Sequence, residues 1–457
     1  MASQDAALEH EFTHVTREVT RIPLAFPHRR TWWIAFSAAL FLLGVYLVSA
    51  AVTFGVGIGA WGNDIPVNWG IAISNYIWWI GIGHAGTLIS AMLLLMRQQW
   101  RNSLNRFAEA MTLFAVVCGG LYPIIHLGRP WFFYWMAPYP SAMGVWPQFK
   151  SPLTWDFFAV LTYLTVSAMF WYIGIVPDLA ATRDRARRPI AQIFFGVLAL
   201  GWRGAARHWA RWRQAYRICA AIAVPLVISV HSEISMIFAA GPIPGWMSTV
   251  FPPYFVLGAA FSGFAVVSMI TTVTRRAFGL EDLITEVHLD MLGRLTLATG
   301  MLTAYGYFAD VFGALYGGEP YELHTLHERF FGAEISWAYW GAVVLNFIPL
   351  QLLWLRRFRV DPAVLFLVGL SATIGMWCER YMLLVSSLFR DYLVSAWGHF
   401  WPSVWEWGLF FGSIGLWLTL FLLFVRVLPM LSAFEIKEAT FEEREEEEQA
   451  KKGDRRG

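Results

Sequence analysis

Residues 122–158 read YPIIHLGRPWFFYWMAPYPSAMGVWPQFKSPLTWDFF and join two long apolar segments of the chain. This joint carries His126, Arg129 and Asp156 among prolines and aromatic residues. An ionisable group near the hydrocarbon core of a bilayer is costly unless it is satisfied, so such groups usually mark function. We therefore treat the joint as a candidate site, and the rest of the chain defines where it lies.

The composition is that of a protein that crosses a membrane several times. Of 457 residues, 57% are hydrophobic and only 14% are charged, and the apolar runs recur along the whole chain. The first 30 residues are polar, so no cleaved secretory signal is expected. The basic residues are not clustered in a patch, so we expect the lipid bilayer and no nucleic acid as a partner.

Three cysteines, Cys118, Cys219 and Cys378, lie far apart in apolar segments. Their spacing matches neither an iron-sulfur motif nor a c-type haem attachment motif. The sequence therefore predicts that this chain binds no metal or haem unaided.

The distribution of basic residues predicts the topology. A spanning helix needs about 20 mostly apolar residues, and ten stretches qualify. If all ten span, 29 of the 34 Lys and Arg lie on one side together with both termini, and the positive-inside rule makes that side cytoplasmic. The ten stretches are residues 32–56, 66–96, 107–128, 153–177, 215–239, 251–274, 291–314, 335–355, 362–385 and 404–428. The five other basic residues are Arg129, Lys150, Arg329, Arg380 and Arg390.

We expect three regions: a cytoplasmic segment 1–31, an all-α membrane domain 32–430 and a charged cytoplasmic tail 431–457. The second to fifth and sixth to ninth stretches run in the same directions, which suggests two parallel four-helix bundles. Residues 178–214 mix arginines with an apolar run, so part of this connection should be an amphipathic helix on the inner surface. The tail is interpreted as a solvated charge run, disordered or bound to a partner.

With this orientation, several ionisable residues gather toward the outer face. They suggest a polar pocket that opens outward, whereas His84 lies near the middle of the bilayer on a glycine-rich helix face. The outward residues are His126, Asp156, His231, Glu233, Asp310, Glu379 and Arg380.

Simpler explanations stay open for each of these residues. Asp156 follows a Ser-Pro start and would be stabilised at the positive end of a helix by about 0.3–1 kcal/mol. Glu379 and Arg380 are adjacent, point to different sides of a helix and need not pair. For His84, the simpler explanation is a buried residue whose hydrogen bonds are satisfied. Ligation of a b-type haem is an option for His126 or His231, but neither has a second histidine at helical spacing.

A further pair, His324 and His327 in HTLHE, lies in an expected outer loop. The two histidines could bind zinc or lie in a solvated loop without a metal, and the second interpretation is favoured.

An outward pocket with an imidazole and a carboxylate suits the oxidation of a quinol. The reaction needs bases within hydrogen-bond reach of the two hydroxyl groups, and the protons would leave to the outside. No amino-acid side chain here stores electrons, so a neighbouring subunit must accept them.

The chain strongly resembles the NrfD/PsrC-like quinone-interacting membrane subunits, and is most similar to the NrfD-like membrane subunit of bacterial alternative complex III. The resemblance spans about residues 20–430 and includes the ten-helix count. It rests on PVNWGIAISNYIWWIGIGHAGTLISAMLLL (66–95), RFAEAMTLFAVVCGGLYPIIHLGRPWFFYW (106–135), WPQFKSPLTWDFFA (146–159) and GMWCERYMLLVSSL (375–388).

The resemblance implies two four-helix bundles with two flanking helices in the bacterial inner membrane. It implies menaquinol or ubiquinol as substrate, with His126 and Asp156 as the catalytic pair. Further quinol-binding residues are matched to the family only loosely, by their position on the helices: Arg129, His231, Glu233, Asp310, Glu379 and Arg380. His84 is the candidate for a proton path. The implied partners are a periplasmic iron-sulfur subunit, multihaem cytochrome c subunits, a second NrfD-like subunit and a terminal oxidase.

Two alternatives remain. The chain would be the membrane anchor of a molybdopterin or polysulfide reductase-type complex, in which quinol electrons reach a different acceptor. Alternatively, a secondary transporter or proton channel without a redox role would have a similar outward pocket, although no convincing broken helices support it.

Overall fold

The computed structural model describes residues 2–26, 29–64, 66–137, 152–389 and 393–454, and these ranges contain helices and no strand. Lys150, Arg390 and the centre of the 122–158 joint lie outside them. The α-helices are α1 (Ala2–Ala25), α2 (Arg29–Val56), α3 (Gly70–Leu95), α4 (Asn105–His126), α5 (Pro152–Arg185), α6 (Pro189–Leu198), α7 (Ala206–Ala239), α8 (Phe251–Phe278), α9 (Glu286–Gly317), α10 (Pro320–Phe331), α11 (Ser336–Phe347), α12 (Arg356–Arg359), α13 (Pro362–Phe389), α14 (Val404–Val427) and α15 (Ala433–Asp454). The 3₁₀ helices are η1 (Ile58–Trp61), η2 (Gln99–Ser103), η3 (Pro130–Met136), η4 (Pro349–Trp354) and η5 (Val394–Ala396).

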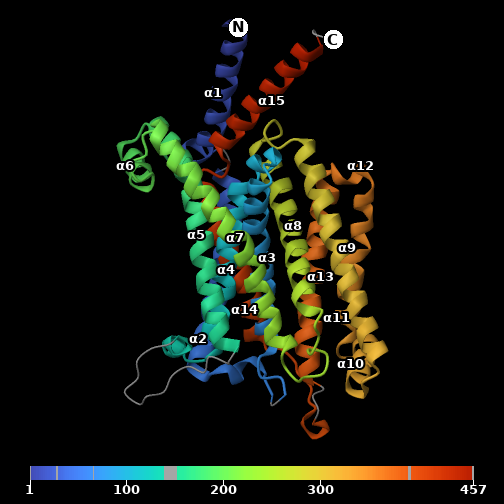
Figure 1. Cartoon of the computed structure of the whole chain (residues 1–457). Helices are drawn as coiled ribbons and strands as arrows, with labels where there is room; N and C mark the ends of the chain where they lie inside the picture. The colour runs from blue at the N-terminus through green and yellow to red at the C-terminus, as the bar shows by residue number, and fades with distance from the viewer. Residues whose placement is uncertain (1, 27–28, 65, 138–151, 390–392, 455–457) are drawn as a thin grey trace.

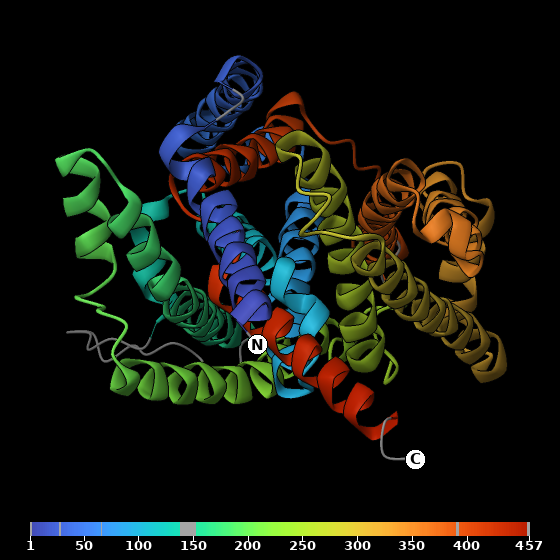
Figure 2. The same ribbon diagram turned by 90° about the horizontal axis from the view of Figure 1, so that it is seen from above.

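The long helices run side by side and fall into groups (Figures 1 and 2). Helix α3 is the central element because it packs against α4, α7, α8 and α13, and most of its residues are buried. Helices α4, α5 and α7 complete one group around it, whereas α8, α9, α11 and α13 form a second. Helices α2 and α14 pack along each other.

All ten stretches expected to span the membrane are helical, and within the described residues nine are long and apolar enough to cross it. The exception is α9, which has 32 residues but too little hydropathy to qualify. The expected helix 335–355 is divided into α11 and η4 because Pro349 has no N–H to continue the hydrogen-bond ladder. The multi-pass membrane character is confirmed, and the count of ten spans stays a prediction.

Both termini emerge at the same end of the bundle (Figure 1). The amphipathic segment expected in 178–214 is the short helix α6, on which Ile190, Ile193 and Val197 are exposed. Residues 433–454 form helix α15, so the charge run is helical from Glu442 to Asp454. The first turn of α15, which precedes this run, is buried against the bundle. Binding of the charge run to a partner stays a prediction.

Buried ion pairs attach α15 to the bundle. Glu435 accepts a hydrogen bond from Arg101 at 2.8 Å, and the backbone N–H of Ala433 donates to Asp178 at 2.9 Å. Burial alone would raise the pKa of Glu435, but the charges of Arg101 and Arg106 outweigh burial and hold its pKa below the usual value. Glu435 is therefore ionised at neutral pH, and the contact weakens only when acid protonates it.

The topology predicts opposite labelling of two sites. In a variant without Cys118, Cys219 and Cys378, a single cysteine at Gln98 should react from the cytoplasm and one at Phe133 from the outside. Impermeant maleimide added to oriented vesicles measures this directly. Labelling of both positions from the same side would contradict the predicted topology.

Candidate functional site

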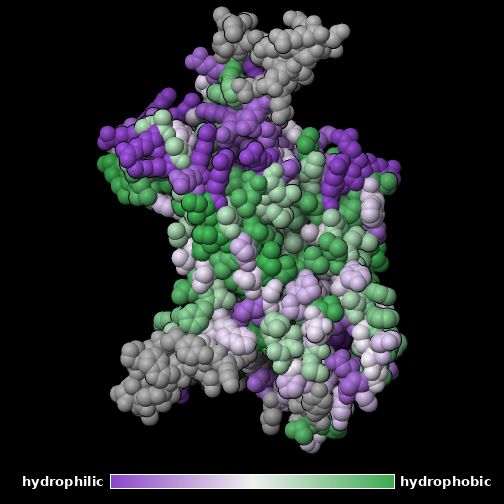
Figure 3. Space-filling view, in the orientation of Figure 1, coloured by the Kyte–Doolittle hydropathy of each residue, from purple (hydrophilic) through white to green (hydrophobic). Residues whose placement is uncertain are grey.

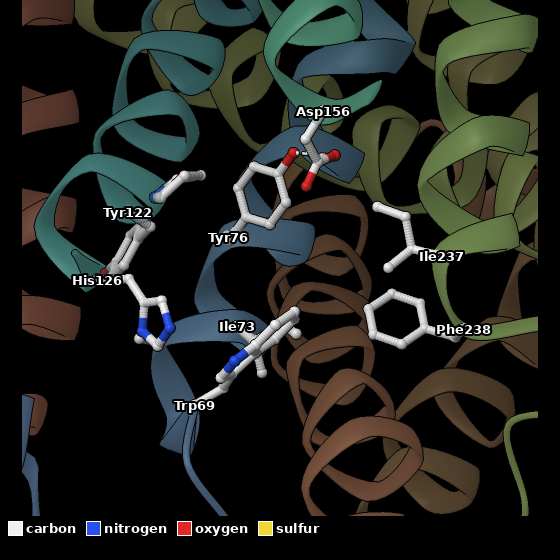
Figure 4. A pocket seen from close by; sticks show the side chains of 10 residues that line it. Trp69, Ile73, Tyr76, Tyr122, His126, Asp156, Ile237 and Phe238 are labelled. Atoms are coloured by element: carbon white, nitrogen blue, oxygen red, sulfur yellow. Dashed lines mark hydrogen bonds between the residues drawn. The ribbon is translucent and has the colours of Figure 1, made fainter. Parts of the chain in front are cut away.

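A narrow pocket lies where α3 begins and α4 ends (Figure 4). These two helix ends lie at the end of the bundle opposite the termini (Figure 1). It contains both residues that the sequence singled out, His126 and Asp156. The lining residues are Trp69, Ala72, Ile73, Tyr76, Tyr122, Pro123, His126, Asp156, Ile237 and Phe238.

Asp156 enters the pocket from the first turns of α5 and is 7% exposed. The hydroxyl of Tyr76 on α3 donates a hydrogen bond to its Oδ1 at 2.8 Å (Figure 4). An ionised carboxylate accepts several hydrogen bonds, so Asp156 can hold Tyr76 and a substrate hydroxyl together. Tyr76 therefore positions the carboxylate that we regard as the base.

His126 ends α4 and is half-buried between two tryptophans. The ring centroids of Trp61 and Trp69 lie 5.7 and 5.6 Å from the imidazole centroid. One turn earlier on α4, Tyr122 donates to the backbone oxygen of Leu409 at 3.1 Å. These contacts fix the end of α4, and Figure 4 shows the imidazole directed into the pocket.

Glu406 supports the pocket from outside it. This residue of α14 is fully buried, and its Oε1 accepts a hydrogen bond from the N–H of Ala72 at 3.0 Å. It thereby satisfies the start of α3, where the N-cap residue Trp69 supplies no side-chain cap. Gly70 between them has φ +54°, and a Cβ there would collide with the Glu406 carboxylate.

A second, apolar hollow adjoins the pocket between α4 and α5. It shares Pro123 and Asp156 with the pocket and is otherwise lined by groups such as Phe133, Val160 and Leu161. The pocket alone has a cavity volume of about 40 Å³, and the hollow has about 310 Å³. The hollow reaches the lower end of the size range of ligand sites, about 300–1,000 Å³, whereas the pocket alone does not. Asp156 lies where the two spaces meet.

His84 and His231 lie in contact with each other and do not line this pocket. Their ring centroids are 4.5 Å apart, and both residues are buried. His84 donates from Nδ1 to the backbone oxygen of Ile80 at 2.6 Å and stacks on Tyr163. The other three ring nitrogens have no hydrogen-bond partner within the described residues. The structure therefore separates His231 from the outward group in which the sequence had placed it.

Glu379 and Arg380 belong to a different cluster, in the second helix group. Their side chains approach to 2.8 Å (Nη1 to Oε1), although the two residues are adjacent, because the long arginine side chain reaches back. Tyr307 donates to Glu379 at 2.7 Å, and the Arg380 guanidinium lies 4.1 Å from the Phe255 ring centroid. These contacts explain the pair as a packed ionic cluster.

The remaining predicted residues lie outside the pocket. Arg129 is exposed at the start of η3, and Glu233 is half-buried one helical turn from Ile237, a residue of the pocket. Asp310 pairs with Arg329 at 3.5 Å in the second helix group.

The region of His324 and His327 was wrongly expected to be a loop. Both residues lie on α10, which begins at Pro320, a favoured first helical residue. His324 stacks on Trp397 at 5.0 Å. No group of three or more potential metal ligands occurs among the residues that the structure describes.

Tyr76, Trp69 and Glu406 were missed by inspection of the sequence. The first two could have been found, since Trp69, Ile73 and Tyr76 follow the i, i+4, i+7 spacing of residues on one helix face. That face is directed toward the joint of residues 122–158. Glu406 had none, because its partner Ala72 is more than 300 residues away in the chain.

Comparison with known proteins identifies a family and two relatives of this chain. The family model described as "Polysulphide reductase, NrfD" matches residues 61–390, a range that includes the whole pocket lining. The chain is 23% identical over 415 residues to the C subunit of the selenate reductase of Mesobacillus selenatarsenatis, covering 87% of this chain and 94% of that protein. It is also 23% identical over 364 residues to the membrane C subunit of a putative dimethyl sulfoxide reductase of Halobacterium salinarum, covering 73% and 75%.

Proposed function

The chain belongs to the polysulphide reductase NrfD family, and from this premise we propose that it is the quinol-oxidising membrane subunit of a reductase-type complex. The observation that carries the proposal is the shared pocket of Asp156 and His126, which continues into an apolar hollow. The hollow gives an isoprenoid quinol a route from the bilayer, and the polar groups receive its hydroxyls.

Each quinol, menaquinol or ubiquinol, loses two electrons and two protons. Asp156, held by Tyr76, accepts the proton of one hydroxyl, and His126 binds the other hydroxyl and accepts its proton. The electrons leave to a partner protein that carries iron-sulfur clusters, and the protons leave at the outer face of the bacterial inner membrane. If the complex moves protons across the membrane, His84 and His231 are the buried imidazoles that take part.

The relatives favour a molybdopterin-type reductase as the partner over alternative complex III. Both relatives are named as subunits of reductases, whereas the sequence motifs had favoured the multihaem cytochrome partners of alternative complex III. A transporter without redox function is a weaker proposal, because family membership points to redox complexes.

Purification of the native complex with a tag on this chain tests the proposal. We expect a catalytic reductase subunit and an iron-sulfur subunit to copurify, and the isolated chain to show no haem spectrum and no bound iron. Multihaem cytochromes in their place would assign the chain to alternative complex III. Purification without any redox subunit, or stoichiometric haem in the isolated chain, would contradict the proposal.

A further inference from the structure

A basic cavity of about 710 Å³ opens at the other end of the bundle, where the termini emerge. Three separate parts of the chain form it: α1, the connection from α5 to α6, and the end of α14. Its walls also include apolar groups such as Phe26 and Phe195. Six arginines line it: Arg17, Arg21, Arg185, Arg187, Arg188 and Arg426.

Protein groups balance little of this positive charge. Arg21 pairs with Glu18 at 2.7 Å, and Arg426 donates to the backbone oxygen of Pro23 at 3.3 Å. For the four other arginines of the cavity, no ion pair is found within the described residues. Six guanidinium groups around one space repel one another, so an anion bound between them would be stabilised.

The surroundings of the cavity indicate that it lies at the level of the lipid headgroups. Helix α6 follows directly after Arg188 and exposes Ile190 (83%), Ile193 (66%) and Val197 (68%). A helix with exposed apolar side chains beside arginines is typical of the membrane interface. Figure 3 shows the same boundary, with a hydrophilic band at the height of α6 above the hydrophobic belt of the bundle.

We propose that this cavity binds the phosphate-bearing headgroup of an anionic phospholipid. Guanidinium groups form paired hydrogen bonds with phosphate oxygens, and basic pockets between membrane helices suit headgroups with several charges. Leu24 lines the cavity and is 36% exposed, and the exposed apolar side chains of α6 lie beside it, so the first part of the acyl chains has apolar surface to contact. A free phosphate compound would use only the arginines. Bound lipid would join α1, α6 and α14.

Native mass spectrometry of the purified complex tests the proposal. The complex is mixed with cardiolipin, phosphatidylglycerol, phosphatidylcholine or inorganic pyrophosphate, and the bound fraction is measured for each. The variant is Arg185→Gln with Arg187→Gln and Arg188→Gln. The control is Arg203→Gln with Arg207→Gln and Arg211→Gln, which removes equal charge from exposed residues outside the cavity.

We expect the anionic lipids to bind the unaltered complex and the control equally, and the cavity variant at least tenfold more weakly. A double variant, Arg17→Gln with Arg187→Gln, should bind the anionic lipids at least threefold more weakly, and it serves if the triple variant does not assemble. Equal lipid binding by the cavity variants and the control would overturn the proposal. If pyrophosphate bound as tightly as cardiolipin, the ligand would be a free phosphate compound. If the cavity variant lost a protein subunit but bound lipid normally, the arginines would form a protein contact. Either result would overturn the lipid proposal.

Discussion

Replacing Asp156 by asparagine is expected to lower quinol-dependent turnover per assembled complex by about 10²–10⁴-fold, the usual contribution of a positioned base. Asparagine keeps the shape of the side chain and can still accept a hydrogen bond from Tyr76, which in the native protein donates at 2.8 Å. It cannot take a proton from the substrate. The amount of assembled complex should therefore stay near normal while turnover falls.

His126→Gln serves as the companion variant, and Glu379→Gln serves as the matched control in the second helix group. We expect turnover to fall in the first and to change far less in the second, because Glu379 does not line the pocket. If Asp156 only stabilises the start of α5, assembly would fall and the turnover of the remaining complex would be normal. Near-normal turnover in both pocket variants would place the site elsewhere.

Replacing Arg106 by leucine should destabilise the protein by about 3–5 kcal/mol, because it leaves carboxylates buried without their partner. The Arg106 side chain is fully buried and lies 3.3 Å from Glu109 and 3.4 Å from Asp178. It also donates to the Tyr216 hydroxyl at 3.1 Å. A large drop in thermal stability in detergent, and in the yield of folded protein, is the expected result.

Arg213→Leu is the matched control for this change. Arg213 pairs with Glu438 at 2.9 Å, but the two side chains are 49% and 37% exposed. Exposed pairs contribute about 0–1 kcal/mol, so stability should hardly change. Equal losses in the two variants would mean that burial of the Arg106 cluster is not what stabilises this end of the bundle.

Much of the fold follows from hydropathy and charge. Apolar length located all ten helical stretches, since a helix must satisfy its backbone groups within the membrane. Their alternation brought the end of α4 and the start of α5 to the same end, which is why His126 and Asp156 were predicted together. Apolar length predicted a span at residues 291–314, but α9 has less hydropathy than the other nine helices because polar residues interrupt its apolar ones.

What the sequence could not supply were contacts between distant helices. His84 and His231 meet only because α3 packs against α7, and Glu406 reaches Ala72 only because α14 lies beside the start of α3. The attachment of α15 was not foreseen for the same reason, since Glu435, which precedes the charge run, pairs with Arg101 in the bundle.

Photolabelling with a tailed quinone that carries a photoreactive group on the ring tests the central claim most directly, with the attachment sites mapped by mass spectrometry. If Asp156 and His126 bind the quinol, the label should attach to lining residues such as Ile73 or Ile237, and excess natural quinol should suppress it. Suppressible labelling near Glu379 in the second helix group, with none in the pocket, would contradict the account.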